Sequence, residues 1–535
     1  MNKTLLACAL AAATTLAAGG AFAATIIPVN MNDPGVGLND PTPATPVGGN
    51  PGTTVGEQRR IAYQFAADLW GAVLESDVEI RVRAQFTPLS CTATSGVLGS
   101  AGAMTVHANF PNAAATEIWY GAALANSLAG SDLGTTTDDI NSNFNANLGT
   151  PGCLEGSGWY YGLDGSTPAG KINFLDVVMH EIGHGLNFQG FYTLSSGAPF
   201  NGRHDIYGTF VHDTVSGLDW VDMTNAQRQA AVTGGGLVWT GAAVTDEVPI
   251  ALAPVTTLNG GGTISGQFVY GQAQFGAPAT PANFSGELVL VNDGSANPTF
   301  GCVASPAGAY AGRIAVVDRG NCAFEIKVKF AEDAGATAVI VANNTTGVIT
   351  MAEDPSVAAT VPALSVSQAD GAILKAGIPG ATLALEYVPD TFAGADAEGR
   401  ALMYAPAVLA SGSSFSHFDT SLSPNALMEP NNTSDTDASL RLDLTPALFQ
   451  DLGWTLNPGN ASTNGGSCDT GIPAVEIGGL VGGANLQAAD AMCRDVHGSG
   501  SAGYRSCIGP FVERLRGLGF VPRSKAAPVT LCTRR

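Results

Sequence analysis

Basic residues are scarce in this chain of 535 residues. Lysine and arginine number 23 against 45 aspartates and glutamates, which gives a formal net charge of −22 at pH 7. A field of this sign repels the phosphates of nucleic acids and the headgroups of anionic membranes. The composition therefore argues against nucleic acid or a membrane surface as a partner.

Long apolar runs are missing beyond the N-terminus. Residues 1–23 combine Lys3, an apolar run from Leu5 to Ala18 and the small-residue sequence Ala21-Phe22-Ala23, which predicts a cleaved signal peptide. The apolar run is too short and too rich in alanine for a membrane anchor. We therefore expect a secreted protein, or one exported to a periplasm, with no membrane span.

Closely spaced cysteine pairs are absent as well. No Cys-x-x-Cys sequence occurs, so a structural zinc finger is not expected. Cys8 belongs to the signal peptide, and the even number of remaining cysteines in an exported chain indicates disulfides. Their clustering along the chain favours Cys91–Cys153, Cys302–Cys322, and two pairs among Cys468, Cys493, Cys507 and Cys532.

Aromatic residues contribute only 7% of the chain, whereas hydrophobic residues contribute 45% and glycines number 68. This balance is typical of a globular protein rich in loops, not of a disordered one. The length exceeds that of a single core, so we expect roughly two to four domains. No internal repeat is visible.

The sequence His180-Glu181-Ile182-Gly183-His184 carries the strongest functional signal. Residues four apart lie on one face of a helix, so His180 and His184 can bind one metal ion. Glu181 can reach a water on that ion without being a ligand. The pattern is typical of zinc metalloproteases, in which zinc lowers the pKa of the water to about 7 and the glutamate takes its proton. The alternative is a buried helix whose histidines only form hydrogen bonds.

Flanking residues predict where this helix begins and ends. Asn173 is a good N-cap, and Asp176 completes an approximate capping box. Gly185 and Asn187 tolerate the left-handed conformation that ends a helix. Between them an apolar stripe predicts a buried face, formed by Leu175, Val178, Met179, Ile182 and Leu186.

A catalytic zinc site needs three protein ligands and one open position. The extended pattern HExxHxxGxxH would supply the third, but Asn187 and Gly190 occupy its glycine and final histidine positions. His417, in Ser416-His417-Phe418-Asp419, is the candidate that we favour. The alternatives, which need the intervening loop to fold back, are His204, Asp205 and His212.

Two further sequences follow His417. Asn425-Ala426-Leu427-Met428-Glu429-Pro430 comes first, and LTPALFQDLGW, from Leu444 to Trp454, predicts a short helix ended by Gly453. With the HExxH sequence before them, they resemble the leishmanolysin-like metzincins, in which a late third histidine precedes an N-x-L-M-x-P Met-turn and a helix ending in Asp-Leu-Gly. The resemblance implies zinc ligation by His180, His184 and His417, with Met428 as an apolar floor. The family usually has glycine where Asn187 stands, and asparagine is the next best residue for a positive φ.

The residues between His184 and His417 contain a second domain. A strand over 314–317, a helix over 324–334 and a strand over 338–342 predict a β/α order. The sequence GRIAVVDRGNCAF, followed by AEDAGATAVIVANN, closely resembles the protease-associated (PA) domain, over about residues 264–388. The resemblance implies a lid or substrate-selecting module without catalytic residues.

The segment before the HExxH helix predicts a mixed α/β half-domain. Residues 58–75 have helical periodicity, and residues 78–86 and 116–120 predict strands. Residues 139–147 alternate polar and apolar side chains, so we expect an edge strand that pairs with an extended peptide.

These features predict an α+β metzincin-type catalytic domain with an inserted α/β PA domain and a small disulfide-rich C-terminal unit. The expected boundaries are a signal peptide at 1–23, a Pro/Gly-rich linker or pro-segment at 24–56, a split catalytic domain at 57–262 and 390–456, the PA domain at 263–389, and a linker with the Cys-rich extension at 457–535.

The function expected from the sequence is that of a secreted zinc-dependent endopeptidase acting on polypeptides. Glu181 would be the general base toward a zinc-bound water, with His180, His184 and His417 as ligands of Zn²⁺. One alternative is a secreted binding or adhesion module on a degenerate protease scaffold, and another is a non-proteolytic zinc hydrolase. Many acidic loops leave structural Ca²⁺ open, and nothing in the sequence indicates the oligomeric state.

Overall fold

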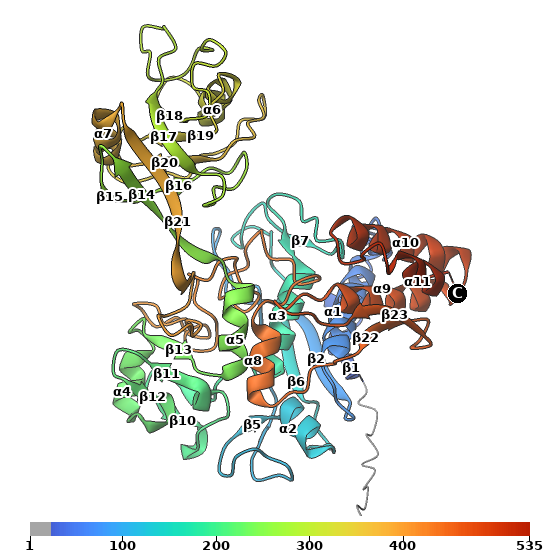
Figure 1. Cartoon of the computed structure of the whole chain (residues 1–535). Coiled ribbons are helices and arrows are strands. Elements are labelled where there is room, and N and C mark those ends of the chain that lie inside the picture. The colour runs from blue at the N-terminus through green and yellow to red at the C-terminus, as the bar shows by residue number, and fades with distance from the viewer. Residues whose placement is uncertain (1–22, 535) are drawn as a thin grey trace, which may run out of the picture. The chain divides into compact units, whose positions relative to one another are not determined.

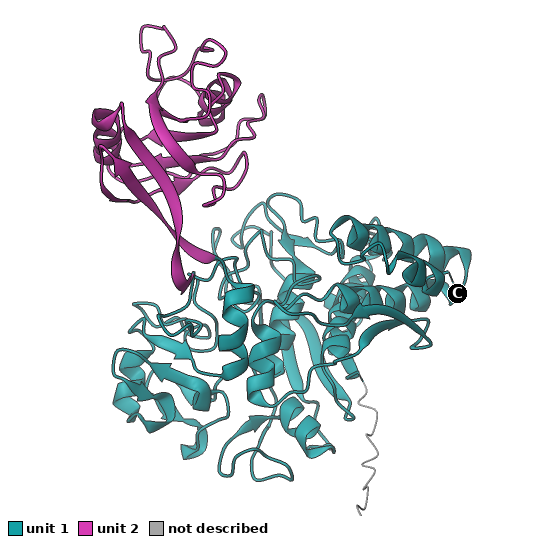
Figure 2. Cartoon of the chain, viewed as in Figure 1, with its two compact units in different colours: residues 1–253, 393–535 teal, residues 254–392 magenta. Residues whose placement is uncertain are grey.

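The chain divides into two compact units. A computed structural model describes residues 23–534 (Figure 1), so the predicted signal peptide lies outside the described residues except for Ala23. Unit 1 consists of residues 1–253 and 393–535, and unit 2 of residues 254–392 (Figure 2). Unit 2 is therefore an insertion within the sequence of unit 1.

A four-stranded sheet forms the centre of unit 1. Its order is β1-β2-β6-β3, made of β1 (Ile26–Asn30), β2 (Ile80–Thr87), β6 (Ile140–Asn145) and β3 (Gly99–Ala103). The first three strands run parallel, and β3 runs antiparallel to β6 at the edge. The antiparallel edge strand lies beside helix α3, which carries the HExxH sequence.

Two helices pack together against this sheet. Helix α1 (Val55–Val73) begins at a capping box between Thr54 and Glu57, whose side chains each accept a hydrogen bond from the other's backbone. Helix α3 (Phe174–Gly185) is buried along most of its length. The fully buried Trp70 joins the two helices, because its indole N–H donates to the carbonyl of Met179 at 3.0 Å.

The N-terminal segment differs from the predicted linker at 24–56. Residues Ile26–Asn30 form β1, which pairs in parallel with Ile80 to Ala84 of β2. Their β-branched side chains favour a strand, and their hydrogen-bond partners lie on a strand some fifty residues away. This segment therefore belongs to the sheet of unit 1.

The sheet edge also differs from our prediction. Strand β6 pairs on both sides, with β2 and with β3, so residues 139–147 do not form the edge. The edge is β3, whose sequence GSAGA has no β-branched or aromatic residue to mark it as a strand. The strand predicted over 116–120 reduces to β5 (Tyr120–Gly121), because Glu117 has a φ of 58°.

Small elements fill the rest of unit 1 before the insertion. The short strands are β4 (Val106–His107), β7 (Trp159–Tyr160), β8 (Ile172–Asn173), β9 (Tyr192–Thr193), β10 (Ala198–Pro199), β11 (Val211–Asp213), β12 (Leu218–Asp219) and β13 (Leu237–Trp239). The helices are α2 (Ala122–Ala129), α4 (Asn225–Ala231) and α5 (Ala242–Ala251). After the insertion, α8 (Thr445–Leu452) packs against α5 and ends at Gly453, whose φ is 112°. The short helix predicted within residues 444–454 and its end at Gly453 are thus confirmed.

Unit 2 contains an eight-stranded sheet. Its order is β15-β14-β21-β17-β18-β19-β20-β16, with β14 (Pro254–Gly262), β15 (Gly266–Phe268), β16 (Gly271–Gln272), β17 (Ser285–Leu290), β18 (Ile314–Asp318), β19 (Ala338–Ala342), β20 (Ala363–Val366) and β21 (Ala381–Phe392). Helices α6 (Phe324–Asp333) and α7 (Gln368–Gly377) accompany it. The predicted strands and helix over residues 314–342 are confirmed to within a residue at each boundary.

Alternate residues of β18 enter two different apolar cores. Ile314 and Val316 belong to one core, and Ala315 and Val317 to the other. This separation follows from the two-residue period of a strand with both faces covered. Unit 2 begins earlier and ends later than the predicted 263–389, because β14 and β21 pair as far as Pro254 and Phe392.

The C-terminal extension belongs to unit 1. It contains β22 (Asn460–Thr463), β23 (Cys468–Pro473), α9 (Gly482–His497), α10 (Ala502–Gly517) and α11 (Ala526–Cys532). Disulfides join Cys468 to Cys532 and Cys493 to Cys507. Helix α9 packs along α1, and Phe511 stacks on Phe65 of α1. The extension therefore shares the core of unit 1, in contrast to the separate small unit that we predicted.

The expected disulfides Cys91–Cys153 and Cys302–Cys322 are confirmed, as are the two pairs expected among the last four cysteines. Within residues 23–534, no helix combines the length and apolar character needed to cross a bilayer.

The core of unit 2 generates a stability prediction. Ile340 on β19 is fully buried, so its replacement in Ile340→Ala leaves a cavity and should lower the opening free energy of this strand by about 2–5 kcal/mol. The matched control is Ile373→Ala on α7, where the side chain is 49% exposed and the change should stay within about 0.5 kcal/mol. Native-state hydrogen exchange of the full chain measures both, and equal losses would contradict the proposed core.

Candidate metal centre

Helix α3 carries three of the four predicted site residues, His180, Glu181 and His184. Asn173 caps it, since its side-chain oxygen accepts a hydrogen bond from the N–H of Leu175 at 3.0 Å. Asp176 does not form the predicted capping box, because its carboxylate accepts from the distant N–H of Ala438 at 2.9 Å instead. The helix ends before Asn187, whose φ is 91° as its position predicted.

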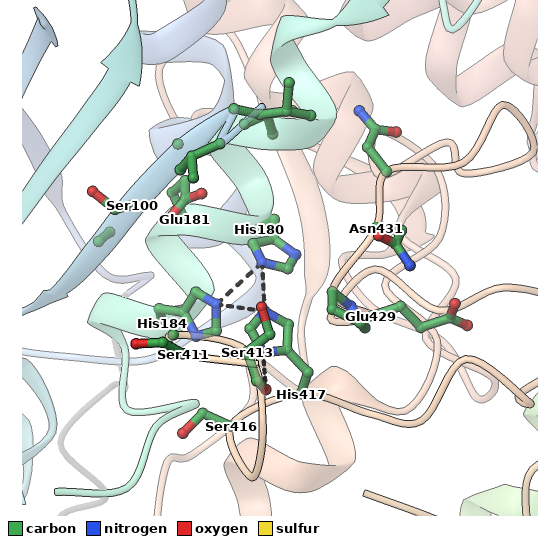
Figure 3. A pocket seen from close by; sticks show the side chains of 18 of the residues that line it. Ser100, His180, Glu181, His184, Ser411, Ser413, Ser416, His417, Glu429 and Asn431 are labelled. Atoms are coloured by element: carbon green, nitrogen blue, oxygen red, sulfur yellow. Dashed lines mark hydrogen bonds between the residues drawn. The ribbon is translucent and has the colours of Figure 1, made fainter. Parts of the chain in front are cut away.

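Three imidazole rings meet at one point of unit 1. The Nε2 atom of His184 lies 3.1 Å from that of His180 and 3.2 Å from that of His417. The remaining pair, His417 and His180, is 3.3 Å apart (Figure 3). His417 comes from a loop 233 residues after His184, so the fold brings together the three residues that the sequence singled out.

The other nitrogen of each ring binds a backbone carbonyl. The Nδ1 atoms of His180, His184 and His417 lie 2.7, 2.8 and 2.8 Å from the carbonyl oxygens of Leu427, Phe188 and Ser413. A carbonyl only accepts hydrogen bonds, so each Nδ1 carries the proton. Each Nε2 therefore presents a lone pair to the shared centre.

The protonation state of the rings follows from their burial. Burial lowers the pKa of His180, lowers that of His184 to about 3, and lowers that of His417 well below its usual value, helped for the last two by the neighbouring rings. Three neutral imidazoles with converging lone pairs repel one another unless a cation lies between them.

The spacing of the nitrogens fits a zinc ion. Ligands at tetrahedral angles, each about 2.1 Å from zinc, lie about 3.4 Å from one another. The observed separations of 3.1, 3.2 and 3.3 Å are close to this value. The same three residues form a group of potential metal ligands within the described part of the chain.

Glu181 lies beside the three rings with an unsatisfied oxygen. The residue is 5% exposed, and its Oε2 has no hydrogen-bond partner among the described residues. Burial raises the pKa of Glu181 to about 8, offset in part by a hydrogen bond from the backbone of Ala101. A buried oxygen without a partner is costly, so Oε2 is available to a hydrogen-bonding group in the cleft.

Close approach to Glu181 requires glycine on the edge strand. A Cβ at Gly99 would lie 2.5 Å from Oε1 of Glu181. On the opposite side of α3, a Cβ at Gly183 would lie 2.8 Å from the sulfur of Met428, which is fully buried. Met428 thus packs directly against the helix that carries two of the imidazoles.

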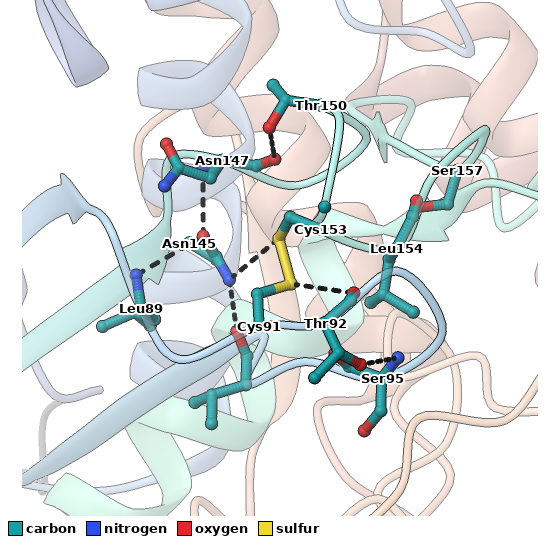
Figure 4. The surroundings of a disulfide bond; sticks show 12 residues. Leu89, Cys91, Thr92, Ser95, Asn145, Asn147, Thr150, Cys153, Leu154 and Ser157 are labelled. Carbon is teal, nitrogen blue, oxygen red and sulfur yellow. Dashed lines mark hydrogen bonds between the residues drawn. A yellow bond between two sulfur atoms is a disulfide. The ribbon is translucent and has the colours of Figure 1, made fainter.

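A cleft of about 1230 Å³ opens onto this centre. Strand β3 lines one side, and residues 411–414, 416, 417 and 429–432 line the other. Figure 3 shows Ser100 of β3 near Glu181, with Glu429 and Asn431 across the three rings. The Cys91–Cys153 disulfide lies in the loop that leads into β3, where Asn145 also holds the carbonyl of Val97 at 2.8 Å (Figure 4).

The alternative third ligands lie outside the cluster and have other partners. Asp205 accepts hydrogen bonds from the backbone N–H groups of Phe191 and Gly208. His204 binds the hydroxyl of Tyr192 at 2.7 Å, and His212 pairs with Asp219. These residues hold the loop that follows α3.

The sequence did not reveal the groups that orient the rings. They are the carbonyls of Phe188, Ser413 and Leu427, and backbone groups have no residue signature. Gly99 and Ala101 were missed because β3 has no strand pattern. Asp176 is an acidic residue on an otherwise apolar helix, which indicates a distant hydrogen-bond partner, but its spacing from Asn173 led us to predict a capping box.

Comparisons with known proteins identify part of the chain. Residues 284–374, within unit 2, match the PA domain. No curated protein matches the chain. The predicted PA domain is therefore present.

Several solved structures share limited similarity with the chain. A zinc aminopeptidase from Bacillus subtilis is 22% identical over 28% of this chain and 36% of its own, with a TM-score of 0.19. An aminopeptidase from Aneurinibacillus sp. strain AM-1 is 19% identical over 31% and 39%, also at 0.19. The subtilisin-like protease Apa1 from Pseudoalteromonas sp. AS-11 is 23% identical over 26% and 34%, at 0.19. The matches span well under two thirds of those proteins, and TM-scores this low do not establish a common overall fold.

The geometry predicts which histidine substitution removes the metal. His417→Ala deletes one of three converging nitrogens, so zinc affinity should fall by at least about 100-fold, more than loss of an outer hydrogen-bond partner causes. His204→Ala is the matched control and should retain the metal, since His204 binds Tyr192 instead. Elemental analysis and chelator competition measure both, and undiminished zinc in His417→Ala would contradict the site.

Proposed function

We propose that this chain is a secreted zinc-dependent endopeptidase of the metzincin type. His180, His184 and His417 hold the zinc ion, and Glu181 is the general base. The observation that carries the proposal is the convergence of three Nε2 atoms, at most 3.3 Å apart, beside the buried side chain of Glu181, whose Oε2 has no hydrogen-bond partner among the described residues. Three neutral imidazoles suit zinc and leave a fourth position open, as catalytic zinc sites do and structural ones do not.

A zinc ion bound there supplies a Lewis acid that polarises the scissile carbonyl and lowers the pKa of a water molecule. The charge of a bound zinc ion would offset the burial that raises the pKa of Glu181, so the ionised group would accept the proton of the attacking water on Oε2 and then pass it to the nitrogen of the leaving amine. Because Glu181 is buried, bulk water does not take up this proton between the two transfers. The carbonyl partners of the three Nδ1 atoms keep the rings in one orientation throughout.

We assign the substrate backbone to β3 in place of the predicted segment 139–147. Strand β3 pairs with β6 on one side only and lines the cleft. Its free edge can pair with an extended peptide. A peptide bound along a strand continues on both sides of the bond that reacts, which favours cleavage within a polypeptide.

Export and domain roles complete the proposal. The four disulfides suit an oxidising compartment, in agreement with the predicted signal peptide. All residues of the proposed site belong to unit 1. The PA domain of unit 2 contributes none of them, as its resemblance implies.

The base is tested by Glu181→Gln on a peptide that is acetylated and amidated at its ends. The wild type should cleave this substrate internally, and the variant should lose about 10²- to 10⁴-fold in kcat because the amide cannot accept the proton. Product mass spectrometry locates the cleavage.

Metal content serves as the control for Glu181→Gln. The variant should retain wild-type zinc, since the glutamate is not a ligand. Wild-type turnover in the variant would contradict the assignment of the base. Cleavage by the wild type only when the amino terminus is free would identify an aminopeptidase, and no cleavage of any peptide despite bound zinc would favour a binding module.

The close contact at Gly99 predicts a second loss of activity. In Gly99→Ala the new Cβ would lie 2.5 Å from Oε1 of Glu181, so the carboxylate must shift. We expect kcat to fall by about 10- to 100-fold with zinc retained. The matched control is Gly509→Ala on α10, where no atom lies within 4 Å of the added Cβ. Equal kcat values for the two variants would show that β3 does not confine the base.

A further inference from the structure

A turn-forming segment, residues 437–443, lies between the C-terminal extension and the metal centre. We call it the brace. Arg514 of α10 donates to Oδ2 of Asp437 at 2.5 Å and to the hydroxyl of Ser439 at 3.2 Å. Asn485 of α9, which is 1% exposed, donates to the carbonyl of Ser439 at 3.0 Å. Side chains from two helices of the extension thus hold the first half of the brace.

The backbone of the extension pairs with the second half. The N–H of Val481 donates to the carbonyl of Leu440 at 2.8 Å, and the N–H of Leu442 donates to the carbonyl of Gly479 at 2.7 Å. A Cβ at Gly479 would lie 2.1 Å from the carbonyl oxygen of Asp443. The brace has no helix or sheet of its own, so the extension satisfies backbone groups that would otherwise be buried without partners.

The opposite side of the brace reaches α3. The N–H of Ala438 donates to Oδ1 of Asp176 at 2.9 Å. Asp176 is 4% exposed and lies one helical turn before His180. Burial raises the pKa of Asp176 well above its usual value, the neighbouring Asp437 raises it further, and Arg514 acts in the opposite direction.

A second path leads from the brace to His180. Asp443, which is 2% exposed, accepts a hydrogen bond from the N–H of Leu427 at 2.6 Å. The carbonyl of Leu427 is the group that accepts from Nδ1 of His180 at 2.7 Å. Both the helix turn before His180 and the carbonyl that orients its ring are therefore attached to the brace.

We propose that the C-terminal extension, residues 457–535, positions the metal ligand His180 through the brace, with Arg514 as a positioning residue. The inference rests on the proposed zinc site. Without the guanidinium, Asp437 loses its cationic partner and the brace loses two of the hydrogen bonds that hold its first half. Zinc affinity then depends on the extension, although none of its atoms touches the metal centre.

The test compares two arginines of α10 in the full-length protein. Arg514→Gln removes the contacts to the brace. Arg516→Gln is the matched control, because Arg516 pairs with Glu513 and Thr530 and makes no hydrogen bond to the brace. Zinc affinity is measured by competition with a chromophoric chelator below the unfolding temperature. We expect Arg514→Gln to weaken zinc binding by about 10- to 100-fold, and Arg516→Gln to change it less than about 2-fold.

A spectroscopic readout separates positioning from general stability. The Co²⁺-loaded protein should show an altered visible absorption spectrum in Arg514→Gln and an unaltered one in Arg516→Gln, and Arg514→Lys should recover part of the affinity by restoring the charge. An unchanged zinc affinity and an unchanged cobalt spectrum in folded Arg514→Gln would overturn the positioning role of the extension and would leave the proposed zinc site intact.

A different result would contradict the proposed function itself, namely that the wild-type protein binds no zinc. Should Arg514→Gln fail to fold, Asn485→Ala removes a single hydrogen bond to the same segment and should weaken zinc binding severalfold. Wild-type affinity in folded Asn485→Ala would then overturn the inference.

Discussion

The structure of the site depends on three hydrogen bonds from imidazole Nδ1–H groups to backbone carbonyls. They fix the tautomer of each ring and aim each Nε2 lone pair at one point. The position of each carbonyl depends in turn on the backbone segment that carries it. Asn187 shows the consequence, because its φ of 91° turns the backbone just after α3 and precedes the residue, Phe188, whose carbonyl meets His184. Much of unit 1 can be understood as support for three such carbonyls.

His417 is held as firmly as His184 although the two residues lie 233 positions apart in the sequence. Unit 2 occupies most of that interval, yet its two ends meet, since the N–H of Ala393 donates to the carbonyl of Ala253 at 2.9 Å. A folded insertion with adjacent ends adds little to the entropy of closing the loop, which grows only with the logarithm of loop length. The third imidazole can therefore be as well ordered as the two that share a helix.

Local patterns predicted those parts of the fold that depend on neighbours in sequence. Helix α3, the elements of residues 314–342 and the order of the motifs around His417 all carry signals within a few residues. Strand β1 and the brace do not, because their partners lie on other segments, and composition alone suggested a linker before β2. The C-terminal extension was predicted as a separate unit because its cysteines and its linker are visible in the sequence. The face of α9 that packs on α1 has the same apolar pattern as any buried helix.

Strand β3 shows why a functional segment can be the hardest to predict. Its residues must approach the carboxylate of Glu181 closely, and at Gly99 any side chain would collide with it. Glycine, serine and alanine satisfy this demand, but they lack the branched or aromatic side chains by which strands are recognised. The strand is stable because it pairs with β6, whose own residues are mostly buried. The requirement for close approach to Glu181 thus also removes the sequence pattern of the strand, and the more regular residues 139–147 were predicted as the edge in its place.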